Sequence, residues 1–261
     1  MSCNLSDSNT SLGFGISIMV VMLITYLPQF LKIKKYESVY GISGKMILLG
    51  NIANFYSFLG TLLSDWDKMF CCGNYDVTGI ECANIIVAFL QIAWTWILMI
   101  IYLDLFLKYM LIEEMSLNIS IGSREHTTYK YYSKLYGYLM MMSGFIAIIF
   151  MASYSPDDDK IQTLGDIYNI FSVIFCVIQW TPQIYETYYQ KRLGSLSLLS
   201  LTLQTPGSFA IFFYQYVLNK TRFSVGGPFL VSGIQMLILT CMGYYYHYFN
   251  YKSGLSHYER I

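Results

Sequence analysis

The chain has 261 residues, no formal net charge, and a composition that is 55% hydrophobic and only 12% charged. Soluble domains carry about 25% charged residues, and the helices of a soluble bundle would show charged faces at helical period. The long uncharged stretches of this chain show no such faces. The composition therefore argues against a soluble protein and predicts one that is embedded in a lipid bilayer.

Seven stretches without Asp, Glu, Lys or Arg follow one another along the chain, and each has at least 19 residues. This length is enough to cross a hydrocarbon core of about 30 Å. The stretches are 8–31, 46–64, 82–103, 135–156, 167–185, 193–219 and 223–251. The first ten residues lack a basic region, so we expect the first stretch to be a retained membrane helix rather than a cleaved signal peptide. The sequence predicts an all-α integral membrane protein with seven transmembrane helices.

The charges between these stretches predict the orientation. If the N-terminus is lumenal, 12 of the 16 Lys and Arg residues fall on the cytosolic side, as the positive-inside rule requires. Three glycosylation sequons, at Asn4, Asn9 and Asn219, then lie in the lumen. A fourth sequon, at Asn118, would be cytosolic and should carry no glycan. With seven spans, the C-terminus is expected in the cytosol.

Two features of the loops and the tail suggest a compartment. Cys71, Cys72 and Cys82 cluster in or beside the lumenal loop between helices 2 and 3, where a disulfide and free thiols are both open alternatives. The tail ends in Tyr258-Glu-Arg-Ile261, which fits the tyrosine-x-x-apolar signal read by sorting adaptors. Because this signal lies in a predicted cytosolic tail, it favours a vacuolar, lysosomal or other endomembrane location.

An internal duplication organises the chain. Two Pro-Gln pairs lie 154 residues apart, and the same offset relates two short motifs at the following helix starts. The equivalent pairs are Pro28-Gln29 with Pro182-Gln183, and Ile42-Ser43 with Leu196-Ser197. Helices 1–3 therefore match helices 5–7, with helix 4 as a connector, so both units run the same way through the membrane. We divide the chain into a first repeat (1–108), a cytosolic loop with the connector helix (109–160), and a second repeat with the tail (161–261).

This pattern resembles the PQ-loop repeat family, which includes cystinosin and vacuolar amino-acid exporters and is similar in fold to the SWEET sugar transporters. The resemblance covers most of residues 12–250. It depends on the two Pro-Gln pairs, each followed by a basic segment and by a "GIS" or "SLS" helix start. It implies two three-helix bundles around a central substrate cavity that opens alternately to the two sides of the membrane.

The prolines need a physical explanation, because a proline inside a helix costs about 3 kcal/mol. Each removes an amide donor and releases a carbonyl near Ile24 or Ile178. In lipid, such groups must find partners within the protein or along a water-filled path. We expect Pro28 and Pro182 to act as hinges, with Gln29 and Gln183 forming hydrogen bonds beside them. The alternative is that both prolines are inert kinks at helix ends.

Polar residues at membrane depth tend to face the interior of a bundle, and they supply the candidates for substrate binding. These are Gln91, Gln235, Asn51, Asn54, Asn84, Gln179, Trp180 and Gln204. Gln91 and Gln235 align in helices 3 and 7 once about ten residues are removed from the longer loop, so we expect them to face one another across the cavity. For each amide, a bond to a neighbouring helix is the alternative to a substrate contact.

Every acidic residue lies near a helix end, and this bears on substrate and coupling. Asp166 opens helix 5, where it either caps the helix or receives a proton from the lumen. Because no acid lies at mid-membrane depth, a cationic substrate would lack a counter-charge. A neutral or zwitterionic solute fits better.

The sequence shows no nucleophile, phosphate-loop or dinucleotide-binding motif, so we predict no enzyme, no cofactor and no metal. The function predicted is transport of a small neutral or zwitterionic solute, such as an amino acid, across an organelle membrane by alternating access. The alternatives are a PQ-loop lipid scramblase or trafficking regulator, and a nutrient-sensing receptor with little flux. The expected partners are the bilayer, the solute and sorting adaptors at the tail, without nucleic acid.

Overall fold

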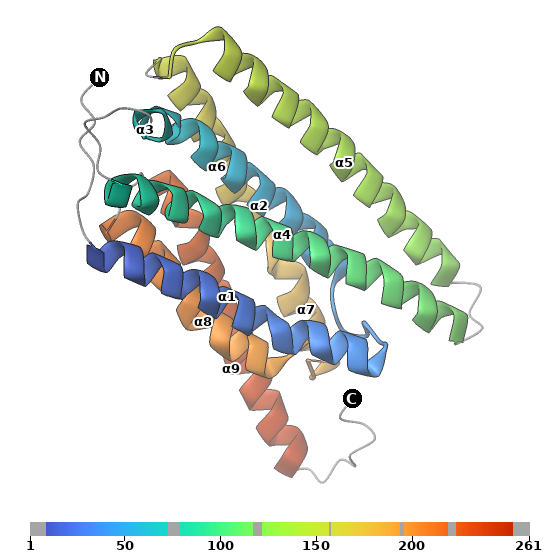
Figure 1. The fold of residues 1–261 in the computed structure, drawn as a ribbon. Helices are drawn as coiled ribbons and strands as arrows, with labels where there is room; N and C mark the ends of the chain where they lie inside the picture. The colour runs from blue at the N-terminus through green and yellow to red at the C-terminus, as the bar shows by residue number, and fades with distance from the viewer. Residues whose placement is uncertain are drawn as a thin grey trace.

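The computed structural model describes residues 9–72, 79–116, 122–156, 158–193, 196–218 and 223–252. Within these ranges, every regular element is a helix (Figure 1). The elements are α1 (Asn9–Tyr36), α2 (Gly44–Ser64), α3 (Trp66–Cys71), α4 (Gly79–Ser116), α5 (Gly122–Ser153), α6 (Asp159–Gln179), α7 (Thr181–Gln190), α8 (Leu198–Phe213), the π-helix η1 (Tyr214–Leu218) and α9 (Phe223–Lys252).

Each of the seven uncharged stretches contains a helix among its described residues, which confirms the predicted all-α membrane fold. Six spans among the described residues are long and apolar enough to cross a membrane, and α6 and α7 together form one of them. The remaining stretch, 193–219, contains α8 and η1, where the chain changes from α-helix to π-helix at Tyr214. The short helix α3 was not predicted, because its six residues include Asp67 and Lys68.

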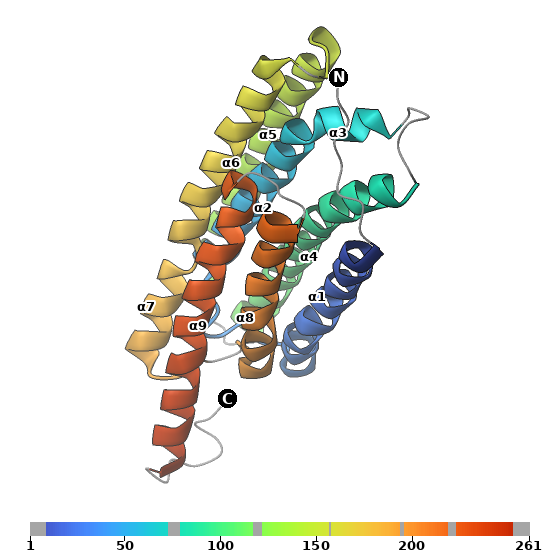
Figure 2. The ribbon, with the colours of Figure 1, turned by 90° about the vertical axis from the view of Figure 1, so that its left-hand side faces the viewer.

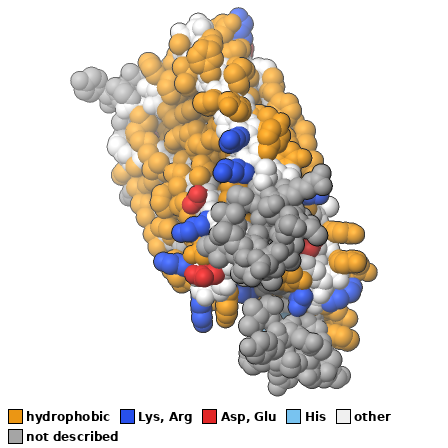
Figure 3. All heavy atoms as spheres, turned by 90° about the vertical axis from the view of Figure 1, so that its right-hand side faces the viewer, with side chains coloured by type: hydrophobic (Ala, Val, Ile, Leu, Met, Phe, Trp, Pro, Cys, Tyr) orange, Lys and Arg blue, Asp and Glu red, His pale blue; other side chains and the backbone are white. Residues whose placement is uncertain are grey.

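The outer surface is mainly apolar, as a bilayer requires. The face shown in Figure 3 is covered largely by hydrophobic side chains. On α5, Met141, Met142 and Phe145 are among the most exposed apolar residues. In water, an apolar surface this extensive would cause association, whereas in a bilayer it contacts lipid.

The helices form two sets of three with the same internal order. In the first set, α4 packs against both α1 and α2; in the second, α9 packs against both α6 and α8. Figure 2 shows α9 between α6 and α8. In each set, the third helix in sequence therefore lies between the other two. The connector α5 packs against α2 and α4 at the edge of the first set (Figure 1).

The two sets meet through reciprocal contacts. The first helix of each set packs against the second helix of the other, since α1 contacts α8 and α6 contacts α2. This exchange is what a two-fold relation between parallel repeats produces. The boundaries at residues 108 and 160 remain a proposal.

The contact between α2 and α6 depends on glycine. A Cβ atom at Gly165 of α6 would lie 2.8 Å from the backbone nitrogen of Ser64 and 3.0 Å from the carbonyl oxygen of Gly60, both on α2. Small residues let the backbones of membrane helices approach this closely. Because backbone atoms form the obstacle, no side-chain rotation can make room.

Gly165→Ala is therefore expected to separate α2 from α6 and to lower the free energy of unfolding by about 1–3 kcal/mol. Thermal unfolding of the purified protein in detergent measures the effect. Gly144→Ala on α5 is the matched control, because a Cβ there would meet no atom within 4 Å. Equal unfolding temperatures for both variants would contradict the close contact.

Candidate functional site

A cavity of about 440 Å³ lies between the two sets of helices. Its wall is formed by α1, α2, α4, α6, α8 and α9, so both repeats contribute to it. Its volume is within the range of about 300–1,000 Å³ that is usual for small-molecule sites. None of the described residues that line it carries a charge.

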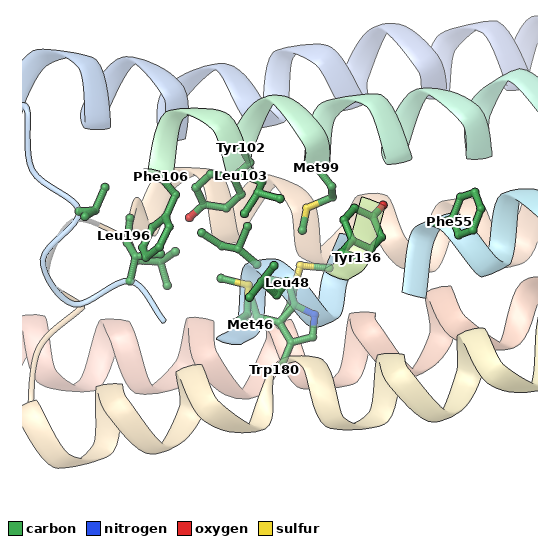
Figure 4. Packing of buried hydrophobic residues seen from close by; sticks show 14 of the residues in the cluster. Met46, Leu48, Phe55, Met99, Tyr102, Leu103, Phe106, Tyr136, Trp180 and Leu196 are labelled. Atoms are coloured by element: carbon green, nitrogen blue, oxygen red, sulfur yellow. The ribbon is translucent and has the colours of Figure 1, made fainter. Parts of the chain in front are cut away.

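Bulky side chains from both sets form much of this wall. Met46 of α2, Met99 and Tyr102 of α4, and Trp180 between α6 and α7 belong to one buried cluster and line the cavity. Figure 4 shows these side chains pointing toward one another, and Leu196 lies beside Phe106 in the same cluster. The cluster therefore joins the two repeats around the site.

Four of the predicted substrate-binding residues line the cavity: Asn54, Gln179, Trp180 and Gln204. The Asn54 amide donates to the carbonyl oxygen of Gly50 at 2.7 Å. The Trp180 indole donates to Ser232 Oγ at 3.0 Å, and Gln204 Nε2 donates to Ser200 Oγ at 2.9 Å. The polar groups of the cavity are therefore mainly amides and hydroxyls, which can both donate and accept hydrogen bonds, together with the indole N–H of Trp180, which only donates.

The structure does not bring Gln91 and Gln235 together, and neither lines the cavity. Gln91 is fully buried and donates to the carbonyl oxygen of Gly15 at 2.8 Å, whereas Gln235 donates to that of Val177 at 2.6 Å. By the 154-residue offset, Val177 corresponds to Leu23, eight residues after Gly15. The two glutamines thus lie at depths that differ by about 12 Å, at 1.5 Å per residue.

Asn51 and Asn84 also lie outside the cavity wall. The Asn51 amide donates to the carbonyl oxygens of Ile47 at 2.9 Å and Met99 at 3.0 Å, which ties α2 to α4. Asn84 is buried in the second turn of α4. The bond from Asn51 to Met99 joins two helices. A bond of this kind was the alternative to a substrate contact.

Asp166 does not cap its helix. α6 begins at Asp159, and the carboxylate of Asp158 accepts a hydrogen bond from the backbone N–H of Lys160 at 2.8 Å. Asp166 lies further along α6, half-buried and outside the cavity wall. The expectation that Asp166 opens the helix was wrong because the helix starts within the acidic run before it.

The structure settles the alternatives that were open for the cysteines. Cys72 and Cys82 form a disulfide between the end of α3 and the first turn of α4, and Cys71 is also disulfide-bonded. Other predicted features lie outside the described residues: the sequons at Asn4, Asn118 and Asn219, the side chain of Asn9, and the sorting signal at Tyr258 and Ile261.

The two Pro-Gln glutamines make reciprocal contacts that the sequence analysis missed. Gln29 Oε1 accepts a hydrogen bond from the backbone N–H of Ser197 at 2.6 Å, and Gln183 Oε1 accepts one from that of Ser43 at 2.8 Å. Gln183 Nε2 also donates to the carbonyl oxygen of Gly41 at 2.9 Å. We call these four contacting residues, Gln29, Ser197, Gln183 and Ser43, the glutamine latch.

The glutamine latch joins the repeats at one end of the cavity, where Gln29 and Ser197 line the wall. Ser43 and Ser197 precede α2 and α8, so each glutamine satisfies an N–H at the start of a helix in the other repeat. The signal was present in the sequence as the equal spacing from each glutamine to a serine. Spacing alone does not show that the contact crosses between repeats.

The two prolines occupy different local structures. Pro28 lies inside the uninterrupted helix α1. Pro182 is near the start of α7, just after the break between α6 and α7 at Trp180. The second repeat therefore has an interrupted helix where the first has a continuous one.

Two parallel sets of three helices around a shared cavity define a two-repeat membrane protein, a layout found among transporters. The family model described as PQ loop repeat matches residues 10–70 and 164–223, one region in each set. The chain is therefore similar to PQ-loop repeat membrane proteins in both sets of helices.

Two known proteins resemble this chain over most of its length. An uncharacterised protein of Schizosaccharomyces pombe, C4C5.03, is 25% identical over 251 residues, which cover 91% of this chain and 81% of that protein. A eukaryotic SWEET transporter structure is 12% identical with a TM-score of 0.50, covering 92% of this chain and all of the other. At that identity, the second likeness concerns the fold alone.

Proposed function

We propose that this protein carries a small neutral or zwitterionic solute, such as an amino acid, across an organelle membrane by alternating access. The observation that carries the proposal is the uncharged cavity of about 440 Å³ between the two repeats. A cationic solute would need an acidic partner at this depth, and none of the described lining residues provides one. Asn54, Gln179 and Gln204 offer amides to a polar but uncharged solute.

Alternating access requires the two repeats to separate at one end of the cavity. Separation at the latch end would break the glutamine latch, which consists of hydrogen bonds rather than a continuous apolar contact. The interruption of the helix at Trp180, just before Pro182, offers a point of bending. Pro28 lies in a continuous helix, so we propose that the hinge at Pro182 moves more than the one at Pro28.

The disulfide supports the orientation inferred from the charges. Disulfides persist in oxidising compartments, so the Cys72–Cys82 bond favours a lumenal position for the segment between α3 and α4. The glutamine latch would then face the cytosol. We propose a vacuolar, lysosomal or related endomembrane for the protein.

Reconstitution into liposomes tests this function. We expect uptake of at least one radiolabelled solute from a panel of amino acids and sugars, with no acceleration of lipid flip-flop. Faster flip-flop without solute uptake would favour a scramblase, and neither activity would favour a nutrient-sensing receptor. Repeating uptake with a pH gradient, in the native protein and in Asp166→Asn, tests Asp166 as a proton-coupling residue.

A further inference from the structure

The cavity wall between α1 and α8 contains residues that also face the outside of the molecule. Val21 of α1 is 48% exposed and Leu203 of α8 is 37% exposed, and both line the cavity. Gly207 of α8 lines the same wall, and a Cβ atom built there would meet nothing within 4 Å. We call Val21, Leu203 and Gly207 the side window.

Contacts at both ends of the two helices bound the side window. Toward the glutamine latch, Ser200 Oγ donates to the carbonyl oxygen of Thr25 at 2.6 Å. Toward the opposite end, Gly15 lies against Tyr214, because a Cβ at Gly15 would be only 2.7 Å from Tyr214 Cζ. α1 is therefore held to α8 on the latch side of the window and to η1, which follows α8, on the other side, and the packing is incomplete between these contacts.

The equivalent place in the other interface is closed. By the 154-residue offset, Gly207 corresponds to Ala53 of α2, and Ile18 corresponds to Ser172 of α6. Ala53 is only 3% exposed, and its carbonyl oxygen accepts a hydrogen bond from Ser172 Oγ at 2.8 Å. The side window therefore belongs to the α1–α8 interface and is not repeated between α2 and α6.

The depth of the side window decides what covers it. Gly207 follows Ser197 of the glutamine latch by ten residues, or about 15 Å along a helix at 1.5 Å per residue. This is about half of a hydrocarbon core of about 30 Å. The medium around α1 and α8 at this depth consists of lipid acyl chains, so an acyl chain is the group that reaches the opening.

The chemistry of the cavity admits the tail of a lipid and not its head. To reach the side window, a head group would have to cross the acyl region, where an unpaired charge is costly, and the described lining residues carry no positive charge that could pair with its phosphate. Apolar side chains of α1 and α8, among them Val21, Met22 and Ile211, line the cavity.

We propose that the acyl chain of a membrane phospholipid enters the central cavity through the side window between α1 and α8, while its head group stays at the membrane surface. The chain shares the cavity with the solute of the proposed function and sets the space left for it. The proposal concerns the same cavity but does not require solute flux, so the two can fail separately.

Photolabelling of the full chain in phosphatidylcholine vesicles tests the entry of the acyl chain. The lipid carries a diazirine in the middle of its acyl chain, and labelled residues are mapped by mass spectrometry. We expect labels on Asn54 and Ser232, which line the cavity on α2 and α9. In Gly207→Trp, these labels should fall roughly ten-fold. This is the loss of occupancy expected when about two methylene groups of the acyl chain are no longer buried in the cavity.

Gly137→Trp on α5 is the matched control, because a Cβ at Gly137 also meets nothing within 4 Å. This variant should keep the cavity labels, and the exposed Ile148 of α5 should be labelled equally in all proteins. If Gly207→Trp unfolds at a lower temperature than the native protein, Leu203→Trp blocks the same opening from the neighbouring turn.

Three results would overturn the proposal. The first is the absence of label on cavity residues while Ile148 is labelled. The second is cavity labelling that both window variants leave unchanged. The third is lipid flip-flop in the same vesicles that is faster than in protein-free vesicles and is slowed by Gly207→Trp, since the head group would then pass through the window.

Discussion

Gln183→Leu is expected to open the end of the cavity at which the glutamine latch joins the two repeats. Leucine can replace neither the bond from the Ser43 N–H nor the bond to the Gly41 carbonyl oxygen. A backbone group left without its partner costs about 1–3 kcal/mol, which corresponds to a roughly five- to hundred-fold shift in an equilibrium. Hydrogen–deuterium exchange at the Ser43 amide should accelerate by this factor, and solute turnover should fall with it.

Two variants separate the latch from a general loosening of the structure. Gln190→Leu is on the same helix, but its amide bonds to Glu186 within α7, so exchange at Ser43 should match that of the native protein. Gln29→Leu should accelerate exchange at Ser197 instead. Unchanged exchange at Ser43 in Gln183→Leu would show that the glutamine does not hold the repeats together.

The helices and their duplication could be predicted because both depend on local patterns. Uncharged stretches of sufficient length mark membrane spans whatever their neighbours are. The 154-residue offset holds in space, since Gln29 and Gln183 make equivalent bonds to Ser197 and Ser43. The break at Trp180 adjoins Pro182, where a hinge was expected. The π-helix at Tyr214 was not predicted, because nothing in the composition around it marks a change of helix type.

The candidate site was predicted only in part, because a repeat shows which residues are equivalent but not which neighbours they face. Asn54 and Gln204 line the cavity. Gln91 was misplaced because its alignment with Gln235 depended on an assumed loop length, and an error of two helical turns moves a side chain by about 11 Å. The side window could not be predicted either, because nothing in the sequence distinguishes Gly207 from other helix residues. The opening becomes evident only when the open space at Gly207 is compared with the closed packing at its counterpart Ala53.

Gln204 and Gln91 form a pair that separates a cavity role from a packing role. Gln204 lines the cavity, so Gln204→Leu should leave a polar group of the solute unpaired, at about 1–3 kcal/mol. This corresponds to a roughly five- to hundred-fold loss of affinity for the solute that the uptake panel identifies. The thermal stability of this variant should fall less than that of Gln91→Leu, because the bond from Gln204 Nε2 to the Thr25 carbonyl oxygen of α1 is long, at 3.4 Å.

Gln91→Leu should show the opposite result. Gln91 lies outside the cavity wall and ties α4 to the carbonyl oxygen of Gly15 on α1. Its loss should lower the free energy of unfolding by about 0.6–2 kcal/mol, the usual range for polar contacts between membrane helices, while solute affinity is retained. Affinity and unfolding temperature measured on the same purified variants decide the matter. A Gln91→Leu protein with native stability and weakened affinity would place the solute next to Gln91 and away from the cavity described above.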